Sequence, residues 1–410
     1  MVAELLIRAG HNDHTVVGDL LAPGGAVALH RPIDRLVANA QTAAQRSELA
    51  QHAHLAGVPY VVDPLTPLLQ VDVDREDSWV RRLSYGRAEL VAPAAMSDYD
   101  KQRLVAEVVE SEQQLGATVI VPPYVLASGP DDPAFAVSIE LLALTARYMR
   151  RNGVNLPLMP IFCGTHRAFA AESAWKDGID RFTAAAADLG PQAVALCLTP
   201  VGDATDSYAK VLRYFLTAQR VKRAGMTTLA WRQGVLGVGV TAAGLDGYET
   251  GIGTGEKADV RDMIARRKPR PDGQARGGGS RTMVYLEPLG RSVPRDVAET
   301  LLGDRGLRAR LICDDERCCP HGINSMLDDP RPHAVRSRAR RLAELAEMPH
   351  RSWRLHQVAK EAKTAAVLAK RGTLLLRAEG LDTQLHATAQ DALARVAEFL
   401  RRDDGQQLTA

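Results

Sequence analysis

Short apolar runs alternate with longer amphipathic stretches along most of this chain. The first run covers residues 26–30, and apolar residues at helical spacing follow it from about residue 34 to residue 56. This spacing predicts helices, while short apolar runs bounded by turn residues predict buried strands. Seven further strands are predicted, at residues 60–63, 118–123, 156–162, 193–198, 227–231, 247–251 and 282–287.

Strands that alternate with helices predict a parallel sheet, because each parallel connection needs a crossover. Eight such units in a chain of 410 residues predict a (β/α)8 barrel. An open doubly wound sheet is the alternative, but no glycine-rich dinucleotide fingerprint follows an early strand. The short glycine-rich segment at residues 251–255 is weak evidence for a phosphate-binding loop.

Two segments differ from this barrel pattern. Residues 261–281 combine arginine and lysine with glycine and proline, which predicts a basic loop. From residue 308 the chain has a cysteine cluster and then helical patterns at residues 334–348, 352–370 and 385–402. We therefore assign residues 1–307 to the barrel and residues 308–410 to a helical C-terminal segment that packs on it.

The composition excludes some classes of protein. The chain is 46% hydrophobic and 24% charged, with a formal net charge of +2, which is typical of globular proteins. No run approaches the ~20 apolar residues of a membrane helix, and the first residues lack the plan of a signal peptide. We expect a cytoplasmic protein with no membrane partner. Affinity for nucleic acid would have to come from local basic patches.

A cluster of thiols is the clearest candidate for metal chemistry. Three of the five cysteines, Cys313, Cys318 and Cys319, fall within seven residues, and His333 and His350 follow. Thiolate and imidazole are the ligands that tetrahedral zinc prefers, and crowded cysteine and histidine spacings indicate metal sites. The spacing is not that of a standard finger or ribbon. A chance cluster of inert buried thiols is the alternative.

Polar residues follow several of the predicted strands, where (β/α)8 barrels place their catalytic groups. Asp63 ends one strand and is a candidate general base or nucleophile, or else an aspartate that caps a turn. Two carboxylates on opposite sides of a pocket suit substitution at a sugar carbon, and Glu249 is the second. Strand alternation lets only one of Tyr248 and Glu249 point into the barrel. The other polar residues at these strand ends are Cys163, Thr199, Asp203, Arg232, Gln233 and Glu287.

The order of these motifs resembles that of the tRNA-guanine transglycosylases and their DNA-modifying relatives. These are zinc-carrying (β/α)8 barrels that exchange guanine for a 7-deazaguanine base, and the resemblance runs from about residue 60 to residue 360 in short matches. Residues 60–63 look like the strand that ends in the family's general-base aspartate. Residues 244–249 (Gly-Leu-Asp-Gly-Tyr-Glu) are similar to "GVDMFD", whose last aspartate is the covalent nucleophile. Glu249 stands in its place and is longer by one methylene.

Two further strands carry the resemblance. Residues 160–164 (Pro-Ile-Phe-Cys-Gly) look like "IVQGG", with Cys163 where the family has a base-recognising glutamine and Gly164 beside it. Residues 195–202 resemble the following "GGLAVGE" strand. The loop after the general base departs from the family's "DSGGFQ", because it reads Asp63-Pro-Leu-Thr-Pro-Leu-Leu-Gln70 here. The resemblance implies a substrate-binding set of Cys163, Gly164, Thr199, Arg232, Gln233 and Tyr248.

The resemblance also implies a structural zinc ion that ties the C-terminal segment to the barrel. Cys313 and Cys318 have the outer spacing of the family's C-x-C-x2-C, and His350 looks like its later zinc histidine. The family's middle cysteine is Asp315 here. The implied ligands are Cys313, Cys318, Cys319 and His350, and His321 or Asp315 remains open in place of Cys319.

An arginine-rich helical pattern follows the cysteines. Arg336 and Arg340 share one face, as do Arg338 and Arg341, which indicates a phosphate-binding surface or a solvated basic helix. The resemblance implies tRNA or DNA and a small modified purine base as partners, and a homodimer.

We thus expect a transglycosylase that replaces guanine through a covalent carboxylate–sugar intermediate. One alternative is a (β/α)8 enzyme for a small glycosidic or phosphorylated metabolite. Another, favoured by the exchange of aspartate for Glu249, is a non-catalytic nucleic-acid-binding relative that keeps the zinc.

Overall fold

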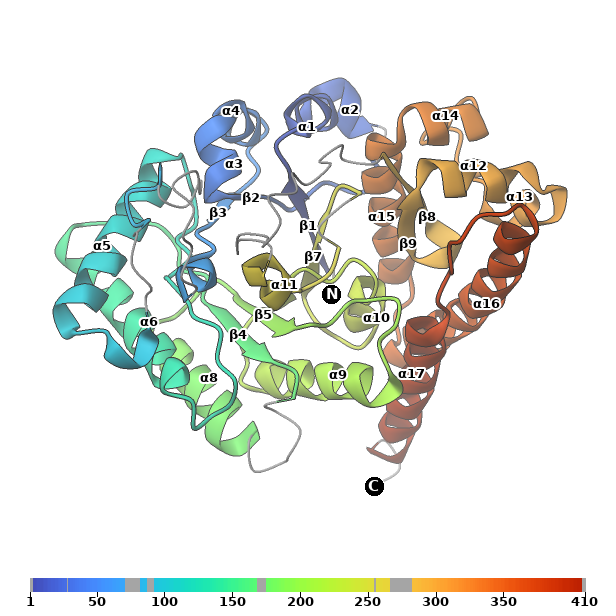
Figure 1. The fold of residues 1–410 in the computed structure, drawn as a ribbon. Helices are drawn as coiled ribbons and strands as arrows, with labels where there is room; N and C mark the ends of the chain where they lie inside the picture. The colour runs from blue at the N-terminus through green and yellow to red at the C-terminus, as the bar shows by residue number, and fades with distance from the viewer. Residues whose placement is uncertain are drawn as a thin grey trace, which may run out of the picture.

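The computed structural model describes residues 3–27, 29–70, 82–86, 92–167, 175–253, 256–265 and 282–407. A curled parallel sheet lies at its centre and helices surround it (Figure 1). The strands follow the order β3-β2-β1-β7-β6-β5-β4. Their bounds are β1 Glu4–Ala9, β2 Arg35–Asn39, β3 Tyr60–Asp63, β4 Ile161–Thr165, β5 Val194–Thr199, β6 Thr228–Ala230 and β7 Gly247–Gly251.

A short extended segment between β3 and β4 closes the sheet into a barrel. Val119 forms a parallel bridge with Val61 of β3, and Ile120 forms one with Leu158, which lies just before β4. The Ile120 amide donates to Pro157 O (2.8 Å), and the Met159 amide donates to Ile120 O (2.9 Å). This segment fills the eighth position, so the predicted (β/α)8 barrel is confirmed.

The predicted first and last strands were wrong, although the total of eight was right. Residues 23–27 form the short helix α2, because Pro23 suits the first turn of a helix. The first two strands are instead β1 and β2, whose charged residues obscured the apolar run. Residues 283–286 do form a strand, β8, but it pairs antiparallel with β9 (Arg291–Pro294) outside the barrel.

Helices cover the outside of the barrel, and several begin at side-chain caps. Ser97 and Asp100 form a capping box at the start of α5, and Asp132 caps α6 ahead of Pro133. The wall helices are α1 His14–Leu21, α3 Ala40–Gln45, α4 Glu48–Leu55, α5 Asp98–Gln114, α6 Pro133–Arg151, α8 Asp180–Ala187, α9 Tyr208–Arg223 and α10 Gly237–Ala242. Shorter turns are η1 Thr66–Gln70, η3 Pro93–Ala95 and η4 Trp175–Ile179.

The C-terminal region has a hydrophobic core of its own. This core begins at Val284, ahead of the boundary expected at residue 308, and includes the three clustered cysteines. Its elements are the turn η5 Glu287–Leu289 and the helices α12 Arg295–Gly303, α13 Arg305–Leu311, α14 Ile323–Asp328, α15 Pro330–Glu347, α16 Arg351–Ala378 and α17 Thr388–Gln407. Helices α15 and α16 pack on α10 of the barrel wall, and α17 packs on α16 and α9 (Figure 1). No helix of the described chain is long and apolar enough to cross a membrane.

The barrel interior changes character along its axis. Alternate residues of each strand point inward, and most of them are apolar, such as Leu6, Val37 and Val61. Towards the carboxyl ends of the strands, the inward residues become charged. The segment predicted as a basic loop, residues 261–281, begins in α11 (Val260–Ala265), and its remainder lies outside the described residues.

Candidate active site and metal centre

Three strands bring an ionic cluster together at the carboxyl end of the barrel. Arg8 of β1 lies between Asp63 of β3 and Glu249 of β7. Its Nη2 is 2.9 Å from Asp63 Oδ2, and its Nε donates to Glu249 Oε1 at 2.7 Å. Both carboxylates are fully buried, and the Arg8 side chain is 6% exposed. The two predicted carboxylates therefore face one guanidinium, which sequence analysis did not identify.

Asp63 accepts three hydrogen bonds and forms an ion pair with Arg8. Oδ1 accepts from the Tyr124 hydroxyl (2.7 Å) and the Leu65 amide (3.0 Å), while Oδ2 contacts Arg8 and Arg232 Nη2 (3.5 Å). Burial alone would raise the pKa of Asp63, but the two guanidiniums and these donors hold it below its usual range. Asp63 is therefore a fixed negative charge and a poor proton acceptor.

Glu249 accepts fewer bonds. Oε1 accepts from Arg8, and Oε2 accepts from the backbone amide of Arg232 at 2.8 Å. Each carboxylate oxygen has two lone pairs, so each oxygen of Glu249 keeps one that no described donor uses. Glu249 therefore keeps more unused acceptor capacity than Asp63.

Strain and desolvation concentrate at this cluster. Arg232 has φ of 56°, in the left-handed region that non-glycine residues rarely adopt. Burial would lower the pKa of Arg8, but Glu249 and Asp63 raise it, so the guanidinium stays charged. Arg8 also lies over the Trp231 ring, 5.1 Å from its centroid. Its Nη1 and Nη2 are buried with no hydrogen-bond partner among the described residues, although Nη2 forms the ion pair with Asp63.

Most of the other predicted substrate-binding residues lie near this cluster. Cys163 of β4 and Cys197 of β5 are cross-strand partners whose side chains are buried inside the barrel. Gly164 and Thr199 follow them, and Gln233 is buried after β6. Tyr248 is the exception, because its side chain does not point into the barrel. Strand alternation turns its ring outward into the layer between sheet and helices, where it packs closely on Gly237 of α10.

The second site is a buried group of four metal-ligand side chains, Cys313, Cys318, Cys319 and His333. Their ligand atoms all lie within 4.8 Å of one another. The sulfurs of Cys318 and Cys319 are 3.8 Å apart, and each is 3.3 Å from His333 Nδ1. Metal–sulfur bonds of about 2.3 Å in a tetrahedron give sulfur–sulfur edges of about 3.8 Å. The residues present therefore fit a tetrahedral metal ion.

His333 is oriented for this role. Its Nε2 lies 2.9 Å from the backbone oxygen of Tyr285, which leaves Nδ1 facing the thiols. Hydrogen bonds from Cys318 and Cys319 lower the pKa of Cys313, and sharing a proton with Cys313 raises the pKa of Cys318 to about 12. Three crowded thiols thus hold few negative charges by themselves, and a cation is what would favour three thiolates.

The structure replaces the predicted histidine ligand. His350 lies at the start of α16 and contacts the Trp353 ring, at 4.8 Å between centroids, so it is not in the thiol group. The alternatives also lie elsewhere. Asp315 pairs with His30 (2.6 Å), and the backbone amide of His321, whose side chain is exposed, donates to Ser325 Oγ (3.0 Å). His333 was noticeable in the sequence as a histidine close after the cysteines. Spacing alone does not show which histidine packs against the thiols in the fold.

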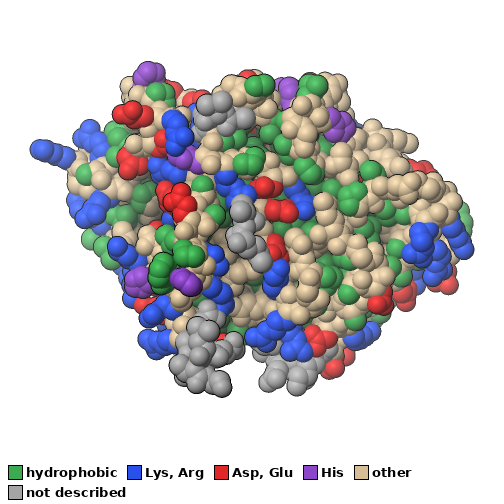
Figure 2. All heavy atoms as spheres, turned by 180° about the vertical axis from the view of Figure 1, so that it is seen from behind, with side chains coloured by type: hydrophobic (Ala, Val, Ile, Leu, Met, Phe, Trp, Pro, Cys, Tyr) green, Lys and Arg blue, Asp and Glu red, His purple; other side chains and the backbone are tan. Residues whose placement is uncertain are grey.

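The arginines of α15 are not a free basic surface. Arg338 is 1% exposed, pairs with Glu256 and lies over the Tyr285 ring, 4.0 Å from its centroid. Arg341 pairs with Glu344 (2.7 Å) and Glu361 (2.5 Å). The other two arginines predicted to bind phosphate are also engaged, Arg340 with Glu287 (2.7 Å) and Arg336 with Cys318 O (3.3 Å). Arg331, at the start of the helix, pairs with Asp13 (3.4 Å). On the back of the molecule, positive and negative side chains are interspersed (Figure 2).

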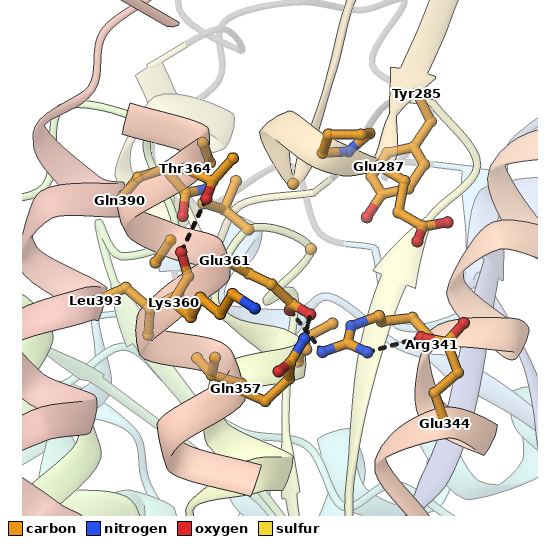
Figure 3. Close-up of a pocket in the computed structure, with 18 residues that line it drawn as sticks. Tyr285, Glu287, Arg341, Glu344, Gln357, Lys360, Glu361, Thr364, Gln390 and Leu393 are labelled. Atoms are coloured by element: carbon orange, nitrogen blue, oxygen red, sulfur yellow. Dashed lines mark hydrogen bonds and ion pairs between the residues drawn. The ribbon is translucent and has the colours of Figure 1, made fainter. Parts of the chain in front are cut away.

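A cavity of about 280 Å³ lies between the barrel wall and the C-terminal helices (Figure 3). Arg341 bridges Glu344 of α15 and Glu361 of α16 on one side, and Gln357 donates to Glu361 (2.6 Å). The polar groups that line this cavity are thus largely paired with one another. None of its lining residues belongs to the ionic cluster in the barrel.

Comparisons with known proteins give no family for this chain. No family model matches it, and no curated protein matches it. Among solved structures, the C-terminal domain of a putative chitinase from Desulfitobacterium hafniense is 12% identical, with a TM-score of 0.35, over 56% of this chain and 65% of that one. The carboxyl transferase domain of Rhizobium etli pyruvate carboxylase is 12% identical, with a TM-score of 0.34, over 98% and 61%. The Rhizobium etli pyruvate carboxylase with acetyl coenzyme A is 10% identical, with a TM-score of 0.34, over 98% and 32%. The chain spans less than two thirds of each, and likeness at these TM-scores carries no functional argument.

Proposed function

We propose that this protein is a transglycosylase that exchanges a purine base on tRNA or DNA for a free 7-deazaguanine base. The observation that supports it most is the ionic cluster, in which Asp63 and Glu249 meet one guanidinium at the carboxyl end of the barrel. Two carboxylates facing one site suit chemistry at a sugar carbon, where positive charge develops in the transition state. The order of sequence motifs supports the same reaction.

Glu249 is the proposed nucleophile. Its carboxylate bonds to C1′ of the nucleotide, the glycosidic bond breaks, and the departing base takes the bonding electrons and a proton from water. The incoming base then attacks C1′, loses its proton to water and releases Glu249. The unused lone pairs of Glu249 support this role.

Asp63 is the proposed electrostatic partner rather than the general base. Because its pKa is lowered, it remains ionised through neutral and mildly acidic pH. A fixed negative charge stabilises the oxocarbenium-like sugar in the transition state. Arg8 positions both carboxylates and offsets their repulsion.

Zinc is the proposed occupant of the Cys313, Cys318, Cys319 and His333 group. Three thiolates and one imidazole are a typical structural zinc set, and four protein ligands leave no position open for water. The ion would then stabilise the C-terminal region and take no part in the chemistry, since the closed site would contribute its binding energy to folding.

The test is incorporation of labelled guanine into unmodified tRNA and into duplex DNA, with mass spectrometry of the denatured protein. We expect exchange into one polymer and a covalent adduct that maps to residue 249. Glu249→Gln should abolish the adduct and lower exchange by at least about 10³-fold. Asp246→Asn is the matched control, because Asp246 precedes the same strand at the other end of the barrel and pairs with Lys222 (2.6 Å). Exchange that survives in Glu249→Gln would rule out this mechanism.

The pairing of the α15 arginines favours a second candidate, an enzyme for a small glycosidic or phosphorylated metabolite. The engagement of those side chains by carboxylates argues against a phosphate-binding role for them. Release of free base from nucleosides, with no exchange into either polymer, would support this reading instead.

A further inference from the structure

A short segment after β7 crosses the mouth of the barrel. Residues 256–260, here called the strap, run antiparallel to the ends of β5 and β6 and lead into α11, which packs against η1 after β3. In Figure 1, α11 lies over the centre of the barrel. The strap residues Ala258 and Val260 are buried in the same cluster as Trp231 and the inward residues of the barrel. The strap therefore lies at the same end of the barrel as the ionic cluster.

The strap is held to the barrel mainly by its backbone. Val201 and Ala258 exchange two hydrogen bonds, at 3.1 and 3.0 Å, and the Val260 amide donates to Thr199 Oγ1 at 3.0 Å. At the surface, Lys257 pairs with Asp203 at 3.0 Å, and this side chain pair is partly exposed. The Gly234 amide also donates to Glu256 O at 2.6 Å. Residues 257–260 thus have fewer bonds than a barrel strand paired on both sides, which makes them easier to open once Glu256 is released.

The first residue of the strap is anchored by α15, the helix that carries His333. Glu256 pairs with Arg338 of α15 and accepts from the Ser292 hydroxyl (2.8 Å) and amide (3.2 Å) of β9. Arg338 is itself held over the Tyr285 ring, and the backbone oxygen of Tyr285 contacts His333. One buried guanidinium thus connects the strap to the helix that carries His333 of the candidate metal site.

We propose that the strap is a lid over the barrel mouth, and that Arg338 holds it closed. Without opening, no ligand reaches Asp63 or Glu249, because both side chains are completely buried beneath it. Arg338 is accordingly a positioning residue for the lid and not a contact for nucleic acid. This inference does not depend on the base-exchange reaction.

Two native thiols report on the lid without any activity assay. Cys163 and Cys197 are buried inside the barrel, 4% and 1% exposed, in the same cluster as Ala258 and Val260 of the strap. We would label the protein with N-ethylmaleimide at low denaturant and quantify both cysteines by peptide mass spectrometry. Opening of the lid makes them reactive, whereas the fold itself protects them.

Arg338→Met removes the anchor, and Arg341→Met is its matched control. Arg341, like Arg338, is a buried arginine of α15. Its partners are Glu344 and Glu361, neither of which belongs to the strap. We expect Arg338→Met to speed labelling of Cys163 and Cys197 about 10- to 100-fold, the range for losing one charge-assisted hydrogen bond. Arg341→Met should change it less than about twofold. Equal rates in the two variants would overturn the role of Arg338.

A disulfide across the strap provides the reverse test, and it applies even where Arg338→Met folds poorly. Residues that exchange both hydrogen bonds in an antiparallel pair have Cα atoms about 5.5 Å apart, within disulfide reach. In Val201→Cys/Ala258→Cys, oxidised glutathione should close this bond and slow labelling of Cys163 and Cys197 at least about tenfold, with reversal by dithiothreitol. Labelling that proceeds unchanged under the closed disulfide would show that the strap is no lid.

Discussion

Replacing Arg8 with methionine tests the ionic cluster most directly. Methionine fills a similar volume but leaves Asp63 and Glu249 buried together, with Arg232 as the only cation of the cluster. Removing one partner of a buried ion pair costs about 3–5 kcal/mol, chiefly because the remaining charge stays desolvated. Arg8 holds two such carboxylates, so we expect the loss at pH 7 to lie in the upper part of that range.

The pH dependence of this loss identifies its cause. In the native protein the pKa of Asp63 is lowered, so its contribution to stability is present above the unfolded pKa and lost as pH falls through the folded value. In Arg8→Met, the burial of Asp63 is opposed by one cation fewer, which should raise the pKa of Asp63 above that of the unfolded chain. The variant then recovers stability relative to the native protein as pH falls from 7 towards about 4.5.

Urea unfolding at pH 7.5, 6 and 5, followed by circular dichroism, measures this difference. Arg341→Met is the control, since Glu344 and Glu361 are 45% and 40% exposed and remain solvated without it. It should cost about 1 kcal/mol with little pH dependence. Arg8→Lys should recover only part of the stability, because an ammonium does not bridge two carboxylates as a guanidinium does. The reasoning would be refuted if Arg8→Met lost no free energy of unfolding, or lost the same amount at all three pH values.

Three other predictions concern the remaining features of the site. The purified protein should contain one equivalent of zinc by metal analysis, lost in His333→Ala and retained in His350→Ala; the opposite pattern would restore His350 as the ligand. Tyr124→Phe removes a hydrogen bond to Asp63, which should raise the pKa of Asp63 and cost about 1 kcal/mol of stability. The acid limb of the stability–pH curve should therefore shift to higher pH, and an unshifted limb would contradict this contact. Arg340→Ala should lower stability, because it removes ion pairs with Glu287 and Asp314. It should change the affinity for tRNA or duplex DNA, measured by fluorescence anisotropy at fixed salt, by less than about twofold. If binding by the variant depends less on salt than binding by the native protein, Arg340 contacts phosphate.

The sequence predicted the parts of the site that follow from strand geometry. Asp63 and Glu249 could be identified because the carboxyl ends of parallel strands converge at one end of a barrel. Arg8 could not, since an arginine at the end of an apolar strand reads as a surface residue, and its partner is 241 positions away. The helical faces shared by the α15 arginines were also predictable, but which elements cover those faces was not. Their partners come from the strap, from η5 and from α16.

The count of strands was predicted more securely than their positions. Residues 283–286 have the alternation of a barrel strand, and only the neighbouring β9 shows that they form a hairpin. Conversely, residues 119–120 close the barrel with isolated bridges that a local pattern barely distinguishes from a loop. Such choices depend on long-range pairing, which propensity does not encode.

The position of β1 has a consequence for how the chain folds. This strand pairs with β2 on one side and β7 on the other, with Leu6 in register with both Arg35 and Glu249. During synthesis at 5–20 residues per second, the first strand therefore waits about 12–48 s for its second neighbour. Until then Arg8 has no Glu249 to pair with, and one edge of β1 is open to other chains. The buried charge of Arg8 disfavours premature packing of that edge into an apolar core, because an unpaired guanidinium is costly to bury.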